Sequence, residues 1–214
     1  MKHYHTIASD IGQVLVRFEM DVVLRALACR LGIDSDVVRS LLGSDIQHDF
    51  EQGLLTTSEF CRLISARLLS RLSPDEVTDF WCQGFCPPAL PSLALLQKLR
   101  SRFFLIAASN TNAIHYTFLE EHFKVATFFD DVVLSHRVHA CKPDRAFFEH
   151  LITRIKCPPD ACIFIDDSAV NIVAARSVGL ESIHFTTPVN LLASLDQLGI
   201  PVTLASDDIV LTDR

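Results

Sequence analysis

Four short segments of this 214-residue chain each end an apolar run on polar side chains, and they lie far apart in the sequence. The segments are residues 7–14, 105–112, 141–144 and 163–171. Their polar side chains are Asp10, Ser109, Asn110, Lys142, Asp166 and Asp167. These side chains match what a Mg²⁺-dependent phosphoryl transfer on an aspartate nucleophile requires: a carboxylate, a hydroxyl with an amide, a lysine and a carboxylate pair.

Asp166 and Asp167 are the hardest of these residues to explain by structure alone. They close an apolar run, and two adjacent carboxylates at the end of a buried strand repel each other and lose hydration. A divalent cation such as Mg²⁺ would hold both. The other positions have ordinary alternatives, because Asp10 could cap a turn, Ser109 could cap a helix and Lys142 could be an exposed lysine.

The second half of the chain alternates helical and strand patterns, which places the four segments at strand ends. Helices are expected over residues 93–100, 113–122, 144–155 and 170–178, and strands over 6–9, 103–108, 131–134, 162–165 and 182–185. Such alternation predicts an α/β fold class with a Rossmann-like parallel sheet core and helices on both faces. In such folds the functional groups gather at the carboxyl ends of the strands.

Residues 19–81 follow a different pattern, with apolar side chains three or four positions apart, which predicts helices. Gly32 follows the first helix, residues 57–58 precede the third and 73–76 begin the fourth. A proline-rich stretch at 86–91 then leads back to the alternating pattern. We therefore expect a Rossmann-like core of residues 1–16 and 89–214, with an all-helical insertion of residues 17–88 after the first strand.

Composition and charge limit the class of partner. With 49% apolar residues the chain can bury a full core, and its net charge of −7 with 19 scattered Lys and Arg residues argues against a nucleic-acid surface. No apolar stretch approaches the roughly 20 residues of a membrane span, and residues 1–5 lack a signal peptide's apolar region. We expect a cytoplasmic monomer or weak dimer that binds a small molecule and neither nucleic acid nor membrane. Residues 200–214 are expected to form either a docked final strand or a frayed tail.

In this order and at these strand ends, the four segments resemble the motifs of the haloacid dehalogenase-like hydrolase superfamily, over essentially the whole chain. The resemblance implies that Asp10 is the nucleophile and Lys142 the catalytic lysine. It implies that Ser109, Asn110 and Lys142 bind the phosphate of a small phosphorylated metabolite. It also implies a Mg²⁺ site made by Asp10, the Gly12 carbonyl, Asp166 and Asp167. The helical insertion resembles the cap that closes over the substrate in one large branch of the superfamily.

Gly12 is the main departure from the phosphatases of that superfamily, which usually carry a second aspartate at this position. That aspartate protonates the leaving group and then activates water, and such help is worth roughly 10²- to 10⁴-fold. Residues 10–14 and 51–53 resemble the sugar-phosphatase branch, which includes glucose 1-phosphate phosphatases and whose first motif also has glycine here. Since an anomeric oxygen is an acidic leaving group, the resemblance implies a sugar phosphate, anomeric in type, as the substrate.

Two alternatives to a phosphatase stay open. A dehalogenase also lacks the second aspartate, because halide leaves without a proton, but the dehalogenases of this superfamily do not use Mg²⁺ and typically lack the pair that Asp166 and Asp167 form. A non-catalytic or very slow phosphate-binding protein on the same fold is the other alternative. If the chain is a phosphatase, the candidates to activate water are Gln13, His48 and Glu51.

Overall fold

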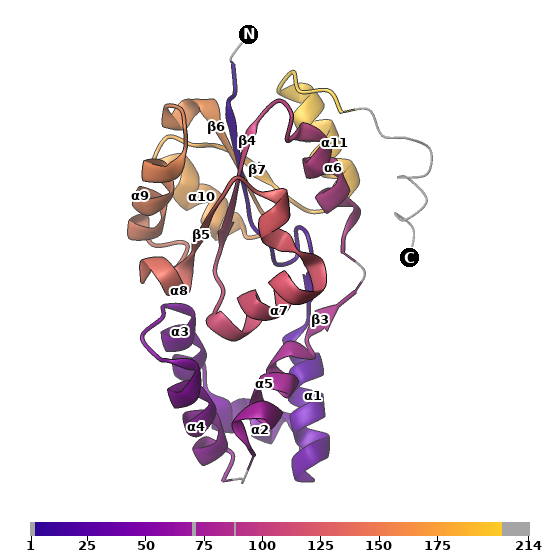
Figure 1. The fold of residues 1–214 in the computed structure, drawn as a ribbon, viewed down its shortest axis with the longest axis vertical. Coiled ribbons are helices and arrows are strands. Elements are labelled where there is room, and N and C mark those ends of the chain that lie inside the picture. The colour runs from indigo at the N-terminus through magenta and orange to yellow at the C-terminus, as the bar shows by residue number, and fades with distance from the viewer. Residues whose placement is uncertain (1–2, 70–71, 88, 203–214) are drawn as a thin grey trace.

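The computed structural model describes residues 3–69, 72–87 and 89–202 (Figure 1). This part of the chain is centred on a five-stranded parallel sheet with the strand order β5-β4-β1-β6-β7. The strands are β1 (Thr6–Ser9), β4 (Phe104–Ser109), β5 (Asp131–Leu134), β6 (Cys162–Asp166) and β7 (Glu181–His184). The predicted α/β fold class is confirmed, and each strand bound lies within one residue of its predicted position.

Helices cover both faces of the sheet, because successive residues of a strand point to opposite sides. One face packs against α6 (Pro91–Leu99), α7 (Ala113–Phe123) and α11 (Pro188–Gln197). The other face packs against α9 (Arg145–Arg154) and α10 (Ala169–Ser177). Ile7 of β1 therefore belongs to the first core and its neighbour Ala8 to the second. Short connecting helices are η1 (Val125–Phe128), α8 (Ser135–Val138) and η2 (Pro159–Ala161).

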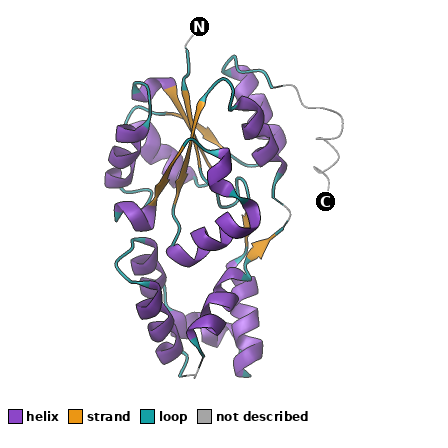
Figure 2. Cartoon of the chain, viewed as in Figure 1, coloured by secondary structure: helices purple, strands orange, loops and turns teal. Residues whose placement is uncertain are grey.

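A separate cluster of helices lies beyond the carboxyl edge of the sheet (Figures 1 and 2). Its helices are α1 (Met20–Leu31), α2 (Ser35–Leu42), α3 (Asp45–Glu51), α4 (Thr57–Arg67) and α5 (Pro74–Cys82). Phe50, Phe60 and Trp81 belong to its apolar core, which is distinct from the two cores of the sheet. The sequence analysis expected four helices in this insertion and missed α3, because only Ile46 and Phe50 mark the buried side of α3 and no side chain caps its start.

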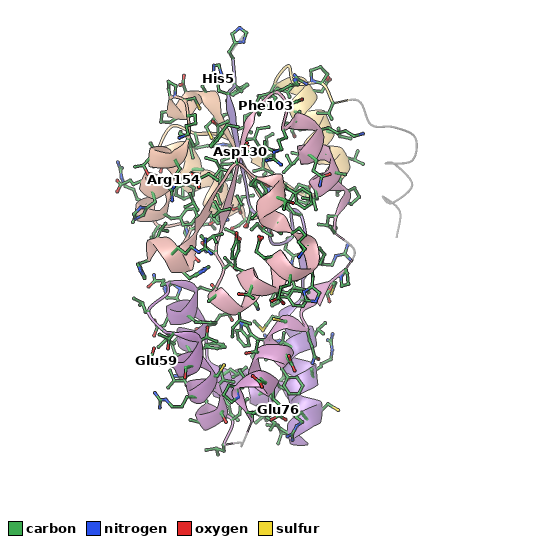
Figure 3. The ribbon with its side chains drawn as sticks, viewed as in Figure 1. His5, Glu59, Glu76, Phe103, Asp130 and Arg154 are labelled. Atoms are coloured by element: carbon green, nitrogen blue, oxygen red, sulfur yellow. The ribbon has the colours of Figure 1, made fainter. Side chains whose placement is uncertain are left out.

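The helices α4 and α5 begin with the same pair of reciprocal hydrogen bonds. The Thr56 hydroxyl accepts from the Glu59 N–H, while the Glu59 carboxylate accepts from the Thr56 N–H. Ser73 and Glu76 repeat this arrangement at the start of α5, and Figure 3 shows both glutamates in the helical insertion. These bonds satisfy N–H groups that a helix start leaves without partners, which explains why the chain turns helical at these two points.

The insertion joins the sheet domain through β2 (Arg17–Phe18) and β3 (Phe85–Cys86), an antiparallel pair that the sequence analysis did not predict because each strand has two residues. His115 of α7 packs against this pair, with ring centroids 4.7 Å from Phe18 and 5.0 Å from Phe85. Its Nε2 atom also lies 3.1 Å from the Trp81 carbonyl oxygen of α5. A buried aromatic cluster therefore connects the two parts.

The described residues contain no helix that is long and apolar enough to cross a lipid bilayer. Of the C-terminal segment for which a strand or a tail was expected, residues 203–214 lie outside the described residues. Residues 200–202 form no strand, and Ile200 is buried in the same core as α6 and α11.

Candidate active site

The carboxyl ends of adjacent strands bring the predicted residues together. Ser9, the last residue of β1, pairs with Ala107 of β4 and Ile165 of β6. Asp10 is therefore the first residue beyond β1, and it lies beside Asp166, which ends β6. In Figure 1, β1 runs from the N-terminal end of the molecule toward the helical insertion, so this edge of the sheet faces the insertion.

Lys142 is buried at this edge and joins the two strand-end carboxylates. Its Nζ atom lies 2.9 Å from Asp10 Oδ2 and 2.6 Å from Asp166 Oδ2, and it donates to the Ala108 carbonyl oxygen at 2.8 Å. An ammonium group has three N–H donors, so each finds an acceptor here. The lysine is fixed between the carboxylates, where its charge offsets theirs.

Asn110 positions the loop that carries this lysine. Its side-chain Oδ1 accepts from the Lys142 N–H at 2.8 Å, and its Nδ2 donates to the Lys142 carbonyl oxygen at 2.8 Å. The sequence analysis expected Asn110 beside the phosphate and did not foresee this paired contact across 32 positions. Asn110 therefore links the loop after β4 to the lysine loop.

The two adjacent aspartates at the end of β6 have different surroundings. Asp166 is fully buried, and its Oδ1 atom accepts from the Ser168 N–H and from Asn171 Nδ2, both at 2.9 Å. Its Oδ2 atom is occupied by Lys142. Asp167 has an exposed side chain, while its carbonyl oxygen lies 2.8 Å from His184 Nε2. Asp166 is thus a fixed internal group, and Asp167 is free to bind a ligand.

Asp10, Asp166 and Asp167 form a cluster in which one carboxylate oxygen of each lies within 4.8 Å of the others. Among the described residues, no other group of three such side chains has metal-binding spacing. Carboxylate oxygens are the ligands that Mg²⁺ prefers, and three carboxylates against one lysine leave an excess of negative charge. This donor set therefore fits a divalent cation.

Burial dominates the electrostatics of the cluster. It raises the pKa of Asp10 to about 6, against the opposing effect of Lys142, and the charge of Asp166 adds to the rise. Burial also raises the pKa of Asp167, and Asp166 contributes there too. For Lys142 burial acts in the opposite direction, but the charges of Asp10 and Asp166 keep its pKa above the usual value. The site holds a charged lysine and carboxylates that a cation would stabilise.

The loop after β4 has the features of an anion site. Ser109 is buried at the end of β4, close enough to Asp10 for its hydroxyl to lower that carboxyl's pKa. Ser135 fixes the loop, since its Oγ accepts from the Thr111 N–H and donates to the Thr111 carbonyl, both at 2.8 Å. Asn112 caps α7, and its buried Nδ2 group has no partner among the described residues. N–H groups at a helix start favour an anion such as phosphate.

Ser135 is a supporting residue that the sequence analysis missed. It is fully buried and directly follows the strand predicted over residues 131–134. The sequence did hold a signal for it, namely a polar residue directly after a predicted strand. The segments 7–14, 105–112 and 163–171 place their polar residues at strand ends in the same way.

Gly12, the position without the expected aspartate, has room for a side chain. A Cβ atom on Gly12 would meet no other atom within 4 Å, and its backbone is outside the left-handed region that favours glycine. Its carbonyl oxygen accepts from the Val14 N–H at 2.7 Å in the turn after β1. Packing therefore does not force glycine at this position.

The sequence profile of the haloacid dehalogenase-like hydrolase family matches residues 6–179. This span begins at β1 and ends after α10, so it includes every residue of the cluster at the sheet edge. The chain belongs to the haloacid dehalogenase-like hydrolase family, as its four segments predicted.

Several characterised proteins are similar in sequence over most of this chain. The D-ribitol-5-phosphate phosphatase of Bacteroides thetaiotaomicron is 26% identical over 184 residues, which cover 82% of this chain and 89% of that protein. The sesquiterpene phosphatase astK of Aspergillus oryzae is 24% identical over 160 residues, 74% of this chain and 82% of that protein. The drimenol cyclase drtB of Aspergillus calidoustus is 39% identical over 180 residues, which cover 82% of this chain but 33% of that enzyme.

Solved structures share the fold. A HAD family enzyme of Bacteroides thetaiotaomicron matches with a TM-score of 0.81 at 23% identity, covering 87% of this chain and 96% of that one. The same enzyme in complex with magnesium and inorganic phosphate gives a TM-score of 0.79 at 23% identity, covering 86% and 96%. This likeness covers most of the chain and shows the fold that the two proteins share.

Proposed function

We propose that this chain is a Mg²⁺-dependent phosphatase that hydrolyses a small phosphomonoester through an aspartyl-phosphate on Asp10. The observation that carries this proposal is the position of Lys142 Nζ, 2.9 Å from Asp10 and 2.6 Å from Asp166, at a strand edge that also presents Asp167. Relatives named as phosphatases support the reaction class. The acidic pair Asp166 and Asp167 argues against the dehalogenase alternative. Together with Lys142 it also argues against the non-catalytic alternative.

In the first step Asp10 attacks the phosphorus atom in line with the leaving oxygen. Ser109 and the Asn110 N–H group bind the other phosphate oxygens. Lys142, whose three donors are directed at Asp10, Asp166 and the Ala108 carbonyl, contributes the positive charge that offsets the phosphate. Because these donors are already fixed, they stabilise the charge of the transition state with little rearrangement. In the second step water attacks the phosphorus of the aspartyl-phosphate and releases inorganic phosphate.

The residues that would hold Mg²⁺ are Asp10, Asp167 and Asp166, with the Gly12 carbonyl. The cation would supply positive charge that offsets the phosphoryl oxygens. Since both oxygens of Asp166 are already hydrogen-bonded, we assign it chiefly the role of fixing Lys142 and the start of α10.

We further propose that residues 17–88 act as a cap that excludes water and binds the leaving group. The substrate class we favour is a sugar phosphate, because residues 10–14 resemble the sugar-phosphatase branch. Among such substrates, an anomeric phosphate has the leaving oxygen that depends least on a proton donor. A relative that acts on ribitol 5-phosphate supports a polyol or sugar. A sesquiterpenyl phosphate is the second candidate, favoured by the relative astK, which is named as a sesquiterpene phosphatase.

The test is phosphate release, with and without Mg²⁺, from a panel of glucose 1-phosphate, ribitol 5-phosphate and a sesquiterpenyl phosphate. The controls are EDTA and the variant Asp10→Asn. We expect release that both controls abolish. No release from any substrate by a folded protein that binds Mg²⁺ would favour the non-catalytic alternative.

A further inference from the structure

The proposed mechanism leaves a proton unaccounted for, because Gly12 has no side chain to protonate the leaving oxygen. The sequence analysis named three candidates to activate water, the other role of the missing aspartate, and the structure separates them. Gln13 is exposed, is not titratable, and donates its amide to the Phe18 carbonyl. His48 is exposed on α3. Glu51, the last residue of α3, is half-buried on the side where the insertion meets the sheet domain.

The end of α3 is docked on the sheet domain. The Gln52 carbonyl oxygen lies 3.0 Å from His139 Nδ1, just beyond α8. Gly53 packs so tightly that a Cβ atom there would lie 2.1 Å from the His136 carbonyl oxygen. Figure 1 shows this end of α3 directly beside α8. Two contacts from the residues after Glu51 thus hold it against the segment that leads from β5 to Lys142.

Glu51 lies close to the lysine loop itself. Burial raises the pKa of the Cys141 thiol to about 11, and the charge of Glu51 adds to this rise, which places the carboxylate near Cys141. The next residue is Lys142, whose side chain reaches Asp10. Gln47 Nε2 donates to Glu51 Oε1 at 2.8 Å and orients the carboxylate from within α3.

We propose that Glu51 is the acid and base of this phosphatase, replacing the aspartate missing at position 12; this rests on the proposed function. As the bond between phosphorus and the leaving oxygen breaks, the Glu51 carboxyl gives its proton to that oxygen. The resulting carboxylate then takes a proton from the water that attacks the aspartyl-phosphate, which returns Glu51 to its starting state. The sum is one phosphomonoester and one water converted to one alcohol and one phosphate.

The surroundings of Glu51 suit both roles. Burial raises its pKa, opposed by the hydrogen bond from Gln47 and the charge of His48, so the proton is held nearer to neutral pH than in an exposed glutamate. The charged and titratable groups on the elements around it are His48 on α3, Arg67 of α4 paired with Asp45 at the far end of α3, and His136, Arg137, His139 and Cys141 on the sheet domain.

The test compares leaving groups in Glu51→Gln, which keeps the shape and the contact with Gln47. For an alkyl phosphate, whose leaving oxygen needs a proton, kcat/KM should fall by roughly 10²-fold or more, the range of general acid catalysis. For p-nitrophenyl phosphate, whose leaving group needs none, kcat/KM should change by only a few-fold. Asp49→Asn on the same helix is the matched control and should behave like wild type with both substrates.

Two further measurements complete the test. Adding Gly12→Asp to Glu51→Gln should restore part of the alkyl-phosphate activity, because position 12 has open space. In wild type, the alkyl-phosphate kcat/KM should fall at high pH as Glu51 loses its proton, and this limb should be weaker with the aryl substrate. An equal loss with both substrates, or no loss, would overturn the role of Glu51, whereas a wild type inactive on every substrate would overturn the phosphatase itself.

Discussion

The carboxyl edge of the sheet and the junction with the helical insertion hold their polar groups in different ways. At the sheet edge, Lys142 donates to three acceptors and Asp166 accepts three hydrogen bonds, so the charged groups around Asp10 are fixed before any ligand arrives. At the junction, Trp81 Nε1 is buried with no partner among the described residues, and Glu51 has one hydrogen bond, from its own helix.

This difference fits separate roles for the two regions in the proposed reaction. The phosphate is the same in every phosphomonoester, so the groups that bind it can be fixed within the sheet domain. The leaving group differs between substrates and must enter and leave, which suits a site formed between two separately packed parts of the molecule. We therefore assign phosphate chemistry to the sheet edge, and proton transfer and selectivity to the junction. The following variants test this assignment.

Asp10→Asn should have the largest effect, because it removes the nucleophile at the centre of the sheet edge. We expect phosphate release to fall on the order of 10⁴-fold. Stability should not fall, since burial raises the pKa of Asp10 to about 6 and a neutral amide avoids that cost. Steady-state release and urea unfolding measure the two effects. A rate within tenfold of wild type would show that another group attacks phosphorus.

Lys142→Met should affect stability strongly, because it leaves Asp10 and Asp166 buried without their cation. Removing one partner of a buried ion pair typically costs about 3–5 kcal/mol. We expect a loss of this size in the free energy of unfolding in EDTA, measured by urea titration. Lys156→Met, at an exposed lysine, is the control and should change stability far less. Equal losses in the two variants would contradict the fixed cluster.

His115→Phe should change how stability depends on pH at the junction. Burial lowers the pKa of His115 to about 4 from 6.5, so between these values the unfolded chain binds a proton that the folded chain does not. The free energy of unfolding therefore falls as the pH drops from 6.5 to 4, and it is unaffected by this group above pH 6.5. At about 1.4 kcal/mol per pKa unit, the loss is about 3 kcal/mol.

Urea unfolding at pH 7 and pH 4.5 measures this effect. The wild type should lose more stability between the two values than His115→Phe, while His150→Phe, at an exposed histidine, should keep the wild-type loss. If all three proteins lose the same amount, the junction histidine carries no such cost.

Gly53→Ala should loosen the contact between α3 and α8. Gly53 has a φ of +68° and its added Cβ would collide with the His136 carbonyl, whereas Gly32 has a φ of +69° and open space around it. Gly53→Ala and Gly32→Ala both place an alanine in a strained backbone conformation, which costs about 1–3 kcal/mol. The difference between them in urea unfolding isolates the collision, and we expect lower kcat only in Gly53→Ala. Identical behaviour would mean that α3 docking does not matter for turnover.

Much of the sheet edge was predictable from the sequence. Buried strands appear as short apolar runs, and parallel strands end at one edge, so Asp10, Lys142, Asp166 and Asp167 were expected to meet there. Their meeting needs no knowledge of side-chain orientation, only of strand order and direction. The family profile supports the same reading over residues 6–179.

The junction was less predictable, for physical reasons. The strands β2 and β3 have two residues each, too few to show a pattern. The helix α3 is mostly polar and has only two apolar residues, Ile46 and Phe50. The contact between Asn110 and Lys142 joins backbone and side-chain atoms 32 positions apart, and the docking of Gly53 depends on the shape of α8. Such contacts come from the tertiary arrangement and leave no periodic signal.

The central claim is that Asp10 carries the phosphoryl group during turnover. Acid quenching of the enzyme within the first turnovers, followed by proteolysis and mass spectrometry, measures this directly. We predict one phosphoryl group on the peptide that contains Asp10, dependent on Mg²⁺ and absent in Asp10→Asn. Steady phosphate release with no phosphoryl group on Asp10, or with the group on another residue, would contradict the account.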